Sequence, residues 1–134
     1  MKTTYSRTWK ASKQPRKQRK YQHNAPLHVK AKQINATLHK DLRKKYTIRT
    51  IRLREGDKVK ILRGQYKGQE GKIEEVNIKR GRIFITKVER AKKDGSKSKV
   101  PIHPSNVQVL DLQLEDKKRV ERLSKKKKQE IKNE

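Results

Sequence analysis

The middle of the chain alternates apolar and charged side chains with the period of two that half-buried β-strands show. Val59 and Ile61 alternate with lysines after a Gly-Asp pair, so we expect a strand that is entered through a turn. A second strand is predicted over residues 71–78 and a third over residues 82–88, with the basic turn KRGR between them. Two consecutive glutamates interrupt the alternation within the second strand, which predicts a β-bulge there.

Residues 89–99 are almost entirely polar, and they are predicted to form a loop with a turn at Asp94-Gly95. The following segment, VPIHPSNVQVLDL, predicts two short strands separated by His-Pro-Ser. Five short strands within about 60 residues are typical of a small, strongly bent antiparallel barrel. We therefore expect a mainly β fold with a five-stranded barrel over residues 48–113. The predicted core consists of Ile61, Ile73, Val76, Ile83, Ile85 and Val107.

The two ends of the chain lack this alternation. Residues 1–34 contain two prolines and no sustained apolar period, so they are predicted to be an extended basic arm that is disordered when free. Leu38 and Leu42 are spaced by four residues, which predicts a short helix over residues 35–47. Residues 114–134 are predicted to be a basic tail that begins as a helix.

Positive charge dominates the composition. The chain contains 40 lysines and arginines and 14 acidic residues, which gives a net charge of +26. Residues 1–50 alone contain 15 of these basic residues and a single acid, Asp41. A compact state with this charge repels itself, and binding to a polyanion relieves the repulsion. Nucleic acid is therefore the expected partner. An anionic membrane surface is a weaker alternative, because the sequence has no amphipathic, aromatic-rich face.

Several classes of protein are excluded by what the sequence lacks. There is no cysteine, so disulfides, thiolate metal sites and cysteine nucleophiles are excluded. No apolar run approaches the roughly 18 residues of a transmembrane helix, and the N-terminus has no apolar signal-peptide core, so we expect a soluble intracellular protein. The four histidines are scattered and the carboxylates show no paired spacing that fits a pocket, so we expect no enzyme activity, cofactor, metal or small-molecule substrate.

Four of the six glycines lie beside lysines in the stretch EGDKVKILRGQYKGQEGKI, so a phosphate-binding nucleotide loop has to be considered. A P-loop requires a hydroxyl side chain after its Gly-Lys pair, but Gly71 and Lys72 are followed by Ile73. A dinucleotide-binding loop leads into a helix, whereas this stretch leads into a predicted strand. We therefore interpret the four as turn glycines that permit a positive φ or a close backbone approach. They are Gly56, Gly64, Gly68 and Gly71.

The stretch VKILRGQYKGQEGKIEEVNIKRGRIFI, residues 59–85, resembles a KOW motif, a glycine-punctuated β-hairpin of RNA-associated proteins. The flanking segments SKQPRKQR, NAPLH, LRKKY, VPIHPSNV and LDLQLEDKKR follow in the order of one family. From about residue 7 to residue 120, the chain resembles the universal ribosomal protein of the large subunit called L twenty-four in bacteria and L twenty-six in eukaryotes. Its N-terminal part is most similar to the archaeal branch. One difference is Glu55, which stands where the family often has a basic residue before Gly-Asp.

The resemblance implies an SH3-like barrel that docks on rRNA near the 5′ region of the large-subunit RNA, close to the polypeptide exit tunnel. It also implies a role early in subunit assembly. The expected partners are large-subunit rRNA and neighbouring ribosomal proteins, the expected location is the large subunit in the cytoplasm, and no homo-oligomer is expected. A KOW-type transcription or translation factor that binds RNA transiently is the alternative, although a factor that must dissociate rarely needs such long basic ends.

The candidate rRNA-binding residues are cations suited to phosphates, aromatic side chains suited to stacking on unpaired bases, and polar turn residues. In the arm they are Trp9, Lys10, Lys13, Arg16, Lys17, Arg19, Lys20, Tyr21, His23, His28, Lys30 and Lys32. In the predicted helix they are Arg43, Lys44 and Lys45, and in the barrel they are Arg63, Lys67, Lys72, Lys79, Arg80, Arg82, His103, Ser105 and Asn106. The alternative for the charged residues is a solvated surface, and Ser105 and Asn106 are equally suited to stabilising a turn.

Overall fold

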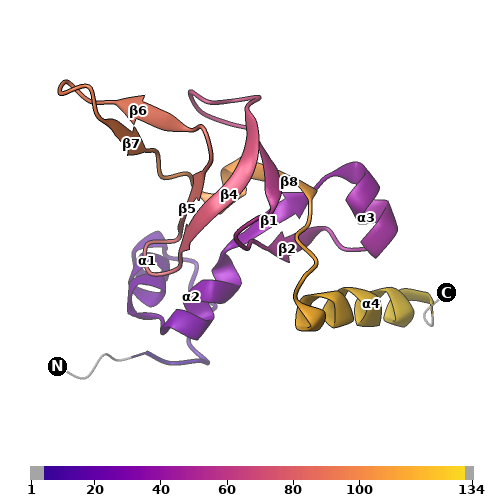
Figure 1. Cartoon of the computed structure of the whole chain (residues 1–134). Helices are drawn as coiled ribbons and strands as arrows, with labels where there is room; N and C mark the ends of the chain where they lie inside the picture. Colours follow the sequence, from indigo (N-terminus) through magenta and orange to yellow (C-terminus); the bar gives the residue numbers. More distant parts are fainter. Residues whose placement is uncertain (1–4, 132–134) are drawn as a thin grey trace.

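A six-stranded sheet forms the body of the protein in the computed structural model, which describes residues 5–131, with side chains as far as residue 124 (Figure 1). The strands lie in the order β2-β1-β8-β3-β4-β5, and β1 pairs with β8 in parallel while the other neighbours are antiparallel. Their bounds are Asn35–Leu38 for β1, Thr50–Arg52 for β2, Lys58–Ile61 for β3, Glu70–Asn77 for β4, Arg82–Ile85 for β5 and Val107–Asp111 for β8.

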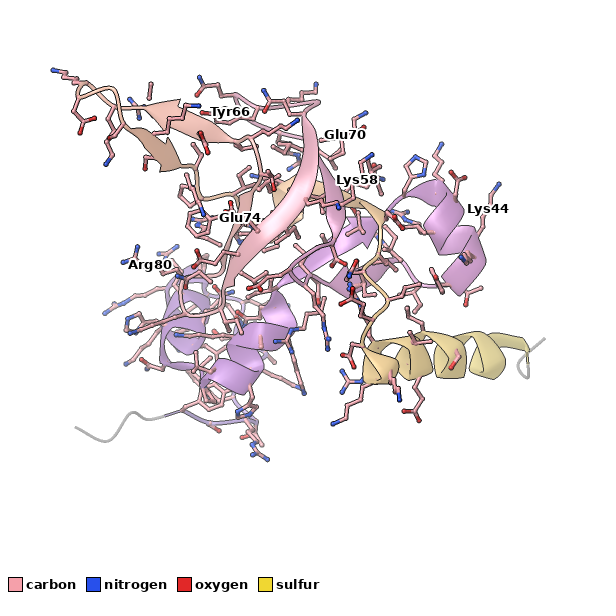
Figure 2. All side chains as sticks on the ribbon, viewed as in Figure 1. Lys44, Lys58, Tyr66, Glu70, Glu74 and Arg80 are labelled. Carbon is pink, nitrogen blue, oxygen red and sulfur yellow. The ribbon has the colours of Figure 1, made fainter. Side chains whose placement is uncertain are left out.

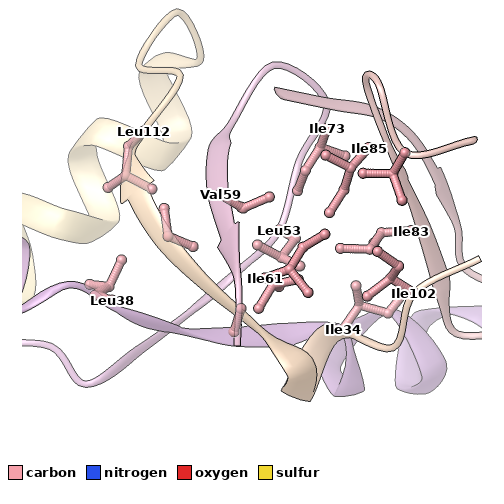
Figure 3. Close-up of a cluster of buried hydrophobic side chains, with 14 of the residues drawn as sticks. Ile34, Leu38, Leu53, Val59, Ile61, Ile73, Ile83, Ile85, Ile102 and Leu112 are labelled. Carbon is pink, nitrogen blue, oxygen red and sulfur yellow. The ribbon is translucent and has the colours of Figure 1, made fainter. Parts of the chain in front are cut away.

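Branched apolar side chains fill the interior of this bent sheet, and strands from both halves of the chain contribute them (Figure 3). Val59, Ile61, Ile73, Ile83 and Ile85 are at most 2% exposed, as the alternating pattern predicts. Alternation therefore identified the inward positions correctly, because one residue in two of a half-buried strand points to the core. Val76, also predicted as core, is half-buried and packs against the edge of the cluster.

The predicted β-sheet body is present, but the described residues form a mixed fold with four α-helices, and the sheet is open, so the closed five-stranded barrel is wrong in its details. β2 and β5 are the two edges and do not pair with each other. The β-bulge is present, as a shift of register between residues 73 and 75 where β4 pairs with β5. The fourth predicted strand is reduced to an isolated bridge between Ile83 and Ile102, followed by the short 3-10 helix η1, Pro104–Asn106, and the fifth is present as β8.

A second, two-stranded sheet replaces the loop predicted for residues 89–99. β6, Glu89–Ala91, pairs with β7, Lys97–Lys99, and this hairpin projects away from the body (Figure 1). Only one of its six strand residues is even half-buried. An apolar alternation cannot reveal strands that have no buried face, so the sequence pattern missed them.

The first 34 residues contain two helices where an extended arm was expected. α1, Pro15–Asn24, begins with proline at a first-turn position, where the missing backbone N–H is not needed. Pro26 ends it, because the residue before a proline disfavours helical geometry, and α2, Leu27–Gln33, follows. Ala25 and Ala31 are buried at 5% exposure, so small apolar side chains hold this segment against the body.

The helix predicted over residues 35–47 begins later than expected. Residues 35–38 form β1, and α3 spans Lys40–Tyr46. The spacing of Leu38 and Leu42 suggested one helix, but Ile34, Ala36 and Leu38 are all buried at 2% exposure or less. That alternation has the period of a strand, and pairing with β8 satisfies it.

The C-terminal segment forms α4, Lys117–Ile131, in agreement with a tail that begins as a helix. Residues 132–134 of the predicted tail, like residues 1–4 of the predicted arm, lie outside the described residues. Leu123 packs into the core at 4% exposure, and Arg119 is buried beside the entrance to β3. None of the described helices is both long and apolar enough to cross a membrane.

Candidate nucleic-acid interface

A basic cavity lies where the two N-terminal helices meet the turn between β4 and β5. It has a volume of about 330 Å³. Its cationic lining consists of Arg19 from α1, Lys30 from α2, Lys79 and Arg80 from the turn, and Arg82 from the start of β5, with His23 and His103 beside them. No carboxylate is among its described lining residues. Segments about 50–60 residues apart in the sequence therefore place their cations around one hollow, which favours an anionic ligand.

Local hydrogen bonds hold both walls of the basic cavity. The Asn77 side chain accepts a hydrogen bond from the Arg80 backbone N–H at 3.0 Å, and Gly81 adopts a φ of +63° that closes the turn. On the other wall, the Lys30 ammonium donates to the His23 carbonyl at 2.9 Å and ties α2 to the end of α1. The side chains of Arg19, Lys79, Arg80 and Arg82 remain exposed. The walls are thus positioned while most of the cations stay available to a ligand.

His103 is neutral in this arrangement. Its Nδ1 accepts a hydrogen bond from the Ser105 backbone N–H at 3.3 Å and lies 2.8 Å from the Ser105 hydroxyl, so the free proton of the ring is on Nε2. Burial lowers the pKa of His103 below its usual value, and the nearby charge of Arg82 lowers it further. Phosphate is the kind of neighbour that would reverse this shift, because it stabilises the protonated ring.

A second hollow, which we call the aromatic pocket, is lined by Tyr5, Ser6, Trp9, Lys17, Lys20, Tyr21 and Asn24 and has a volume of about 350 Å³. The rings of Tyr5 and Tyr21 lie 5.1 Å apart at a 35° tilt, and their hydroxyls are hydrogen-bonded at 2.8 Å. The Lys17 ammonium lies 5.3 Å from the centre of the Trp9 ring. The hydrogen bond to Tyr21 raises the pKa of Tyr5, with burial adding to it, so this phenol is neutral at physiological pH.

The glycines of the predicted KOW hairpin serve two different geometrical purposes. Gly64 and Gly68 have φ values of +95° and +89°, with open space where a side chain would be, and the Gly68 N–H donates to the Ile61 carbonyl at 2.8 Å. Gly71 has an ordinary φ, but a Cβ there would lie 2.6 Å from the side chain of Ile85. The first two permit a turn, and the third permits close packing of β4 on the end of β5.

The remaining candidates are spread over several regions. Figure 2 places Lys44 of α3 at the opposite end of the molecule from Arg80, so the basic trio of α3 does not join the basic cavity. Within that trio, Arg43 is half-buried and its Nε donates to the Leu38 carbonyl at 2.8 Å. Candidates that are exposed on other parts of the surface are Lys10, Lys13, Arg16, His28, Lys32, Lys44, Lys45, Arg63, Lys67 and Lys72. Ser105 and Asn106 lie in η1, where Ser105 and the Asn106 backbone both hydrogen-bond to His103.

The sequence interpretation missed two features. Tyr5 was not among the candidates, because nothing in its position indicates contact with Tyr21, 16 residues away. Arg119 was considered only as part of the basic C-terminal tail, yet its guanidinium pairs with Asp57 through contacts of 2.7 and 2.8 Å, with both side chains at most 5% exposed. The signal available was the Asp57 that follows Gly56 at the start of a strand, since a buried carboxylate requires a partner.

The described residues contain no group of three or more His, Asp or Glu side chains that could hold a metal ion. The fold and surface define a small basic protein built around a β-sheet, whose helices and turns expose many cationic side chains. A model of the family that comprises ribosomal proteins L26 of eukaryotes and L24 of archaea matches residues 12–126. The chain belongs to this family.

Individual relatives agree with the family match. The chain is 47% identical to large ribosomal subunit protein uL24 of Methanocella arvoryzae over 115 residues. The aligned residues cover 86% of this chain and 93% of the relative. It is 45% identical over 115 residues to the protein of the same name from Korarchaeum cryptofilum, covering 86% and 88%. It is also 46% identical over 114 residues to the protein of that name from Methanosarcina barkeri, covering 85% and 98%. Similarity to archaeal proteins agrees with the archaeal-like arm of the sequence.

Proposed function

We propose that this protein is a structural constituent of the large ribosomal subunit that binds rRNA through the basic cavity and the cationic surfaces around it. Three relatives with 45–47% identity over most of both chains have the name of a large-subunit protein. The family consists of ribosomal proteins rather than enzymes. The protein is therefore expected to be located in the ribosomes of the cytoplasm. A net charge of +26 suits a permanent component of a polyanionic assembly.

The observation that supports rRNA binding most strongly is the composition of the basic cavity. Arg19 and Lys30 come from α1 and α2, and Arg80 and Arg82 come from the hairpin of β4 and β5, yet all four line one hollow. A phosphate backbone that passes through it neutralises cations from both the N-terminal helices and the sheet. RNA binding would therefore join these two parts more firmly, which a solvated charged surface would not do.

Finer features of the proposal follow from the family resemblance. The hairpin of β3 and β4 is the KOW element, and its exposed Arg63 and Lys67 flank the turn glycines that let RNA approach the backbone. We place the protein near the 5′ region of the large-subunit rRNA and the rim of the exit tunnel, beside other ribosomal proteins, with a role early in assembly. Nothing in this proposal requires a cofactor, a small-molecule substrate or a second copy of the chain.

The test is a salt titration of the full-length protein on a fragment of large-subunit rRNA, with binding measured by fluorescence anisotropy of the labelled RNA. With about ten phosphates neutralised, affinity should fall by about 10³–10⁵ between 50 and 200 mM salt. Replacing Arg80 and Arg82 by glutamine should weaken binding and reduce the salt slope by about 2, because each phosphate that is no longer neutralised lowers the slope by about 1.

The matched control is the double replacement of Arg90 and Lys92 by glutamine in the β6–β7 region, which removes the same charge far from α1 and α2 (Figure 1). Equal losses from both double variants would show that only total charge matters, and would refute a role for the basic cavity. Co-sedimentation with large subunits in high salt then separates a permanent constituent from a transient RNA-binding factor, because a transient factor would dissociate.

A further inference from the structure

Helix α1 presents two different sets of side chains on two of its faces. Arg19, Gln22 and His23 line the basic cavity, whereas Lys17, Lys20, Tyr21 and Asn24 line the aromatic pocket. Each set follows the three- and four-residue spacing of one helical face. His23 was expected to join Trp9 and Tyr21 as a stacking residue, but the structure places it with the cations instead. A strand bound in the basic cavity is thus one helix diameter away from the aromatic pocket.

The composition of the aromatic pocket indicates what it can hold. Three aromatic rings, from Tyr5, Trp9 and Tyr21, form most of its apolar wall, and Lys17 and Lys20 supply positive charge at its border. No carboxylate is among its described lining residues. A volume of about 350 Å³ lies at the small end of the ligand pockets of proteins, which range over about 300–1,000 Å³. Flat, apolar walls with cations beside them match a flat ring attached to a phosphate.

The pocket is also open to an incoming ring. Trp9 is 59% exposed, which is unusual for a side chain of its size that packs against its own chain. Tyr5 and Tyr21 are fixed relative to each other by their hydrogen bond and ring contact, so they offer a preformed wall. Gln18 donates two hydrogen bonds to the carbonyls of Lys10 and Ser12, at 2.9 and 2.7 Å, and so fixes the preceding segment along α1.

We propose that the aromatic pocket binds one unpaired base of the bound RNA, which stacks on Trp9 and the Tyr5–Tyr21 pair, while Lys17 and Lys20 contact the adjoining phosphates. This inference rests on the proposed RNA-binding function. It adds the requirement that the RNA contain an unpaired base, which attraction between charges alone does not impose. A base inside a duplex is already stacked and paired, so only a loop, bulge or strand end can supply the ring. The protein therefore selects for an unpaired nucleotide beside the stretch of backbone that fills the basic cavity.

The chain contains its own probe for this event, because Trp9 is its single tryptophan. The full-length protein is titrated with a single-stranded oligouridylate or oligoadenylate, and with an abasic ribose-phosphate strand of the same length as the matched control. RNA binding is followed by anisotropy of the labelled strand, and occupation of the pocket by Trp9 fluorescence. We expect both strands to bind through their phosphates, but only the strand with bases to change the Trp9 emission.

The outcomes separate this proposal from the function on which it rests. If both strands bind and change Trp9 emission equally, or if both bind and neither changes it, the base-stacking proposal is wrong and RNA binding stands. If neither strand binds at low salt, the proposed function fails together with the inference. A fully paired RNA duplex is a further control. It should bind without changing the Trp9 emission.

A variant series assigns the effect to the pocket. Tyr21→Ala should weaken binding of the single strand by about 5- to 150-fold, the equivalent of removing one base–aromatic stack, and should leave binding of the abasic strand unchanged. Tyr21→Phe keeps the ring, removes only the phenol hydroxyl, and should retain most of the affinity. No residue of α1 is buried, so these changes leave the core intact. Equal weakening on both strands would show that the tyrosine acts through general structure or charge, and would overturn the proposal.

Discussion

The buried ion pair of Asp57 and Arg119 gives the sharpest test of how the fold is held together. Asp57 is fully buried and accepts four hydrogen bonds, two from the Arg119 guanidinium and two from the backbone N–H groups of Arg54 and Gln113, at 2.7–3.0 Å. Arg119 also donates to the carbonyls of Gln113 and Arg52. The pair therefore joins the start of β3, the end of β2 and the first turns of α4.

Removing one partner leaves the other as a charge without compensation inside the protein. We expect Arg119→Met to lower the free energy of unfolding by about 3–5 kcal/mol, the usual cost of breaking a buried pair from one side. Small domains have only about 5–15 kcal/mol of stability in total. At an m-value of about 2 kcal/mol/M, the urea midpoint should fall by about 1.5–2.5 M. Far-UV circular dichroism is the suitable signal, because the exposed Trp9 does not report on the core.

A double variant distinguishes the ion pair from the packing of the arginine stem. Asp57→Asn combined with Arg119→Met removes both charges, so its cost should be clearly smaller than the sum of the two single costs. The control is Arg54→Gln, which removes a surface ion pair with Asp116 and should barely change the urea midpoint. A loss of less than about 1 kcal/mol from Arg119→Met, or additive costs in the double variant, would refute the structural role of the pair.

Three further predictions concern the glycines and His103. Gly71→Ala should destabilise the protein by about 1–3 kcal/mol in urea denaturation, because its Cβ would lie 2.6 Å from Ile85 Cγ2 and 2.8 Å from the Thr86 carbonyl oxygen. Gly81→Asn should cost much less, since its φ of +63° is one that asparagine adopts and the space is open; similar losses at both positions would contradict the argument from close packing. The pKa of His103 is lowered by burial and by Arg82, so the unfolded chain binds more protons than the folded one just below pH 6.5. The contribution of His103 to stability is therefore complete above pH 6.5 and is lost as the pH falls below it. In the His103→Gln variant, the urea midpoint should no longer show this decrease on acidification. RNA phosphate in the basic cavity should oppose this shift, so RNA affinity should rise more steeply on acidification to about pH 5.5 in the original protein than in His103→Gln.

The inward positions of β3, β4 and β5 could be predicted from the sequence because a strand with one buried face leaves a period of two. The bulge in β4 was visible for the same reason, as a break in that period. β6 and β7 have no buried face, so nothing in their apolar pattern distinguishes them from a loop. The order of the sheet was also inaccessible, because the parallel pairing of β1 with β8 joins residues about 70 positions apart.

The cationic candidates could be predicted only in part. The composition indicates that they bind an anion, but it does not indicate which of them lie together in the folded protein. Arg19 and Lys30 are separated from Arg80 and Arg82 by about 50–60 residues of sequence, and only the folded chain brings them around one cavity. The expectation of an extended arm failed because Ala25, Ala31 and Ile34 anchor the N-terminal helices with very little apolar surface. Small anchors of this kind are invisible to a search for sustained hydrophobic periods.

The two ends of the chain solve the same physical problem in different ways. Each end is strongly basic, so it tends to be repelled from a body that is itself positively charged. The N-terminal helices are held by small apolar contacts, which leave every lysine and arginine of α1 exposed to a ligand. The C-terminal helix instead buries Arg119 against Asp57. The planar guanidinium group can donate to both carboxylate oxygens at once, which the ammonium group of a lysine cannot do with the same geometry. Because a bidentate pair fits in one position only, it also fixes the register of α4 on the sheet, as one buried polar contact can do in a helix pair. The acid at position 57 therefore contributes to the architecture, while most of the basic residues around it remain available for RNA.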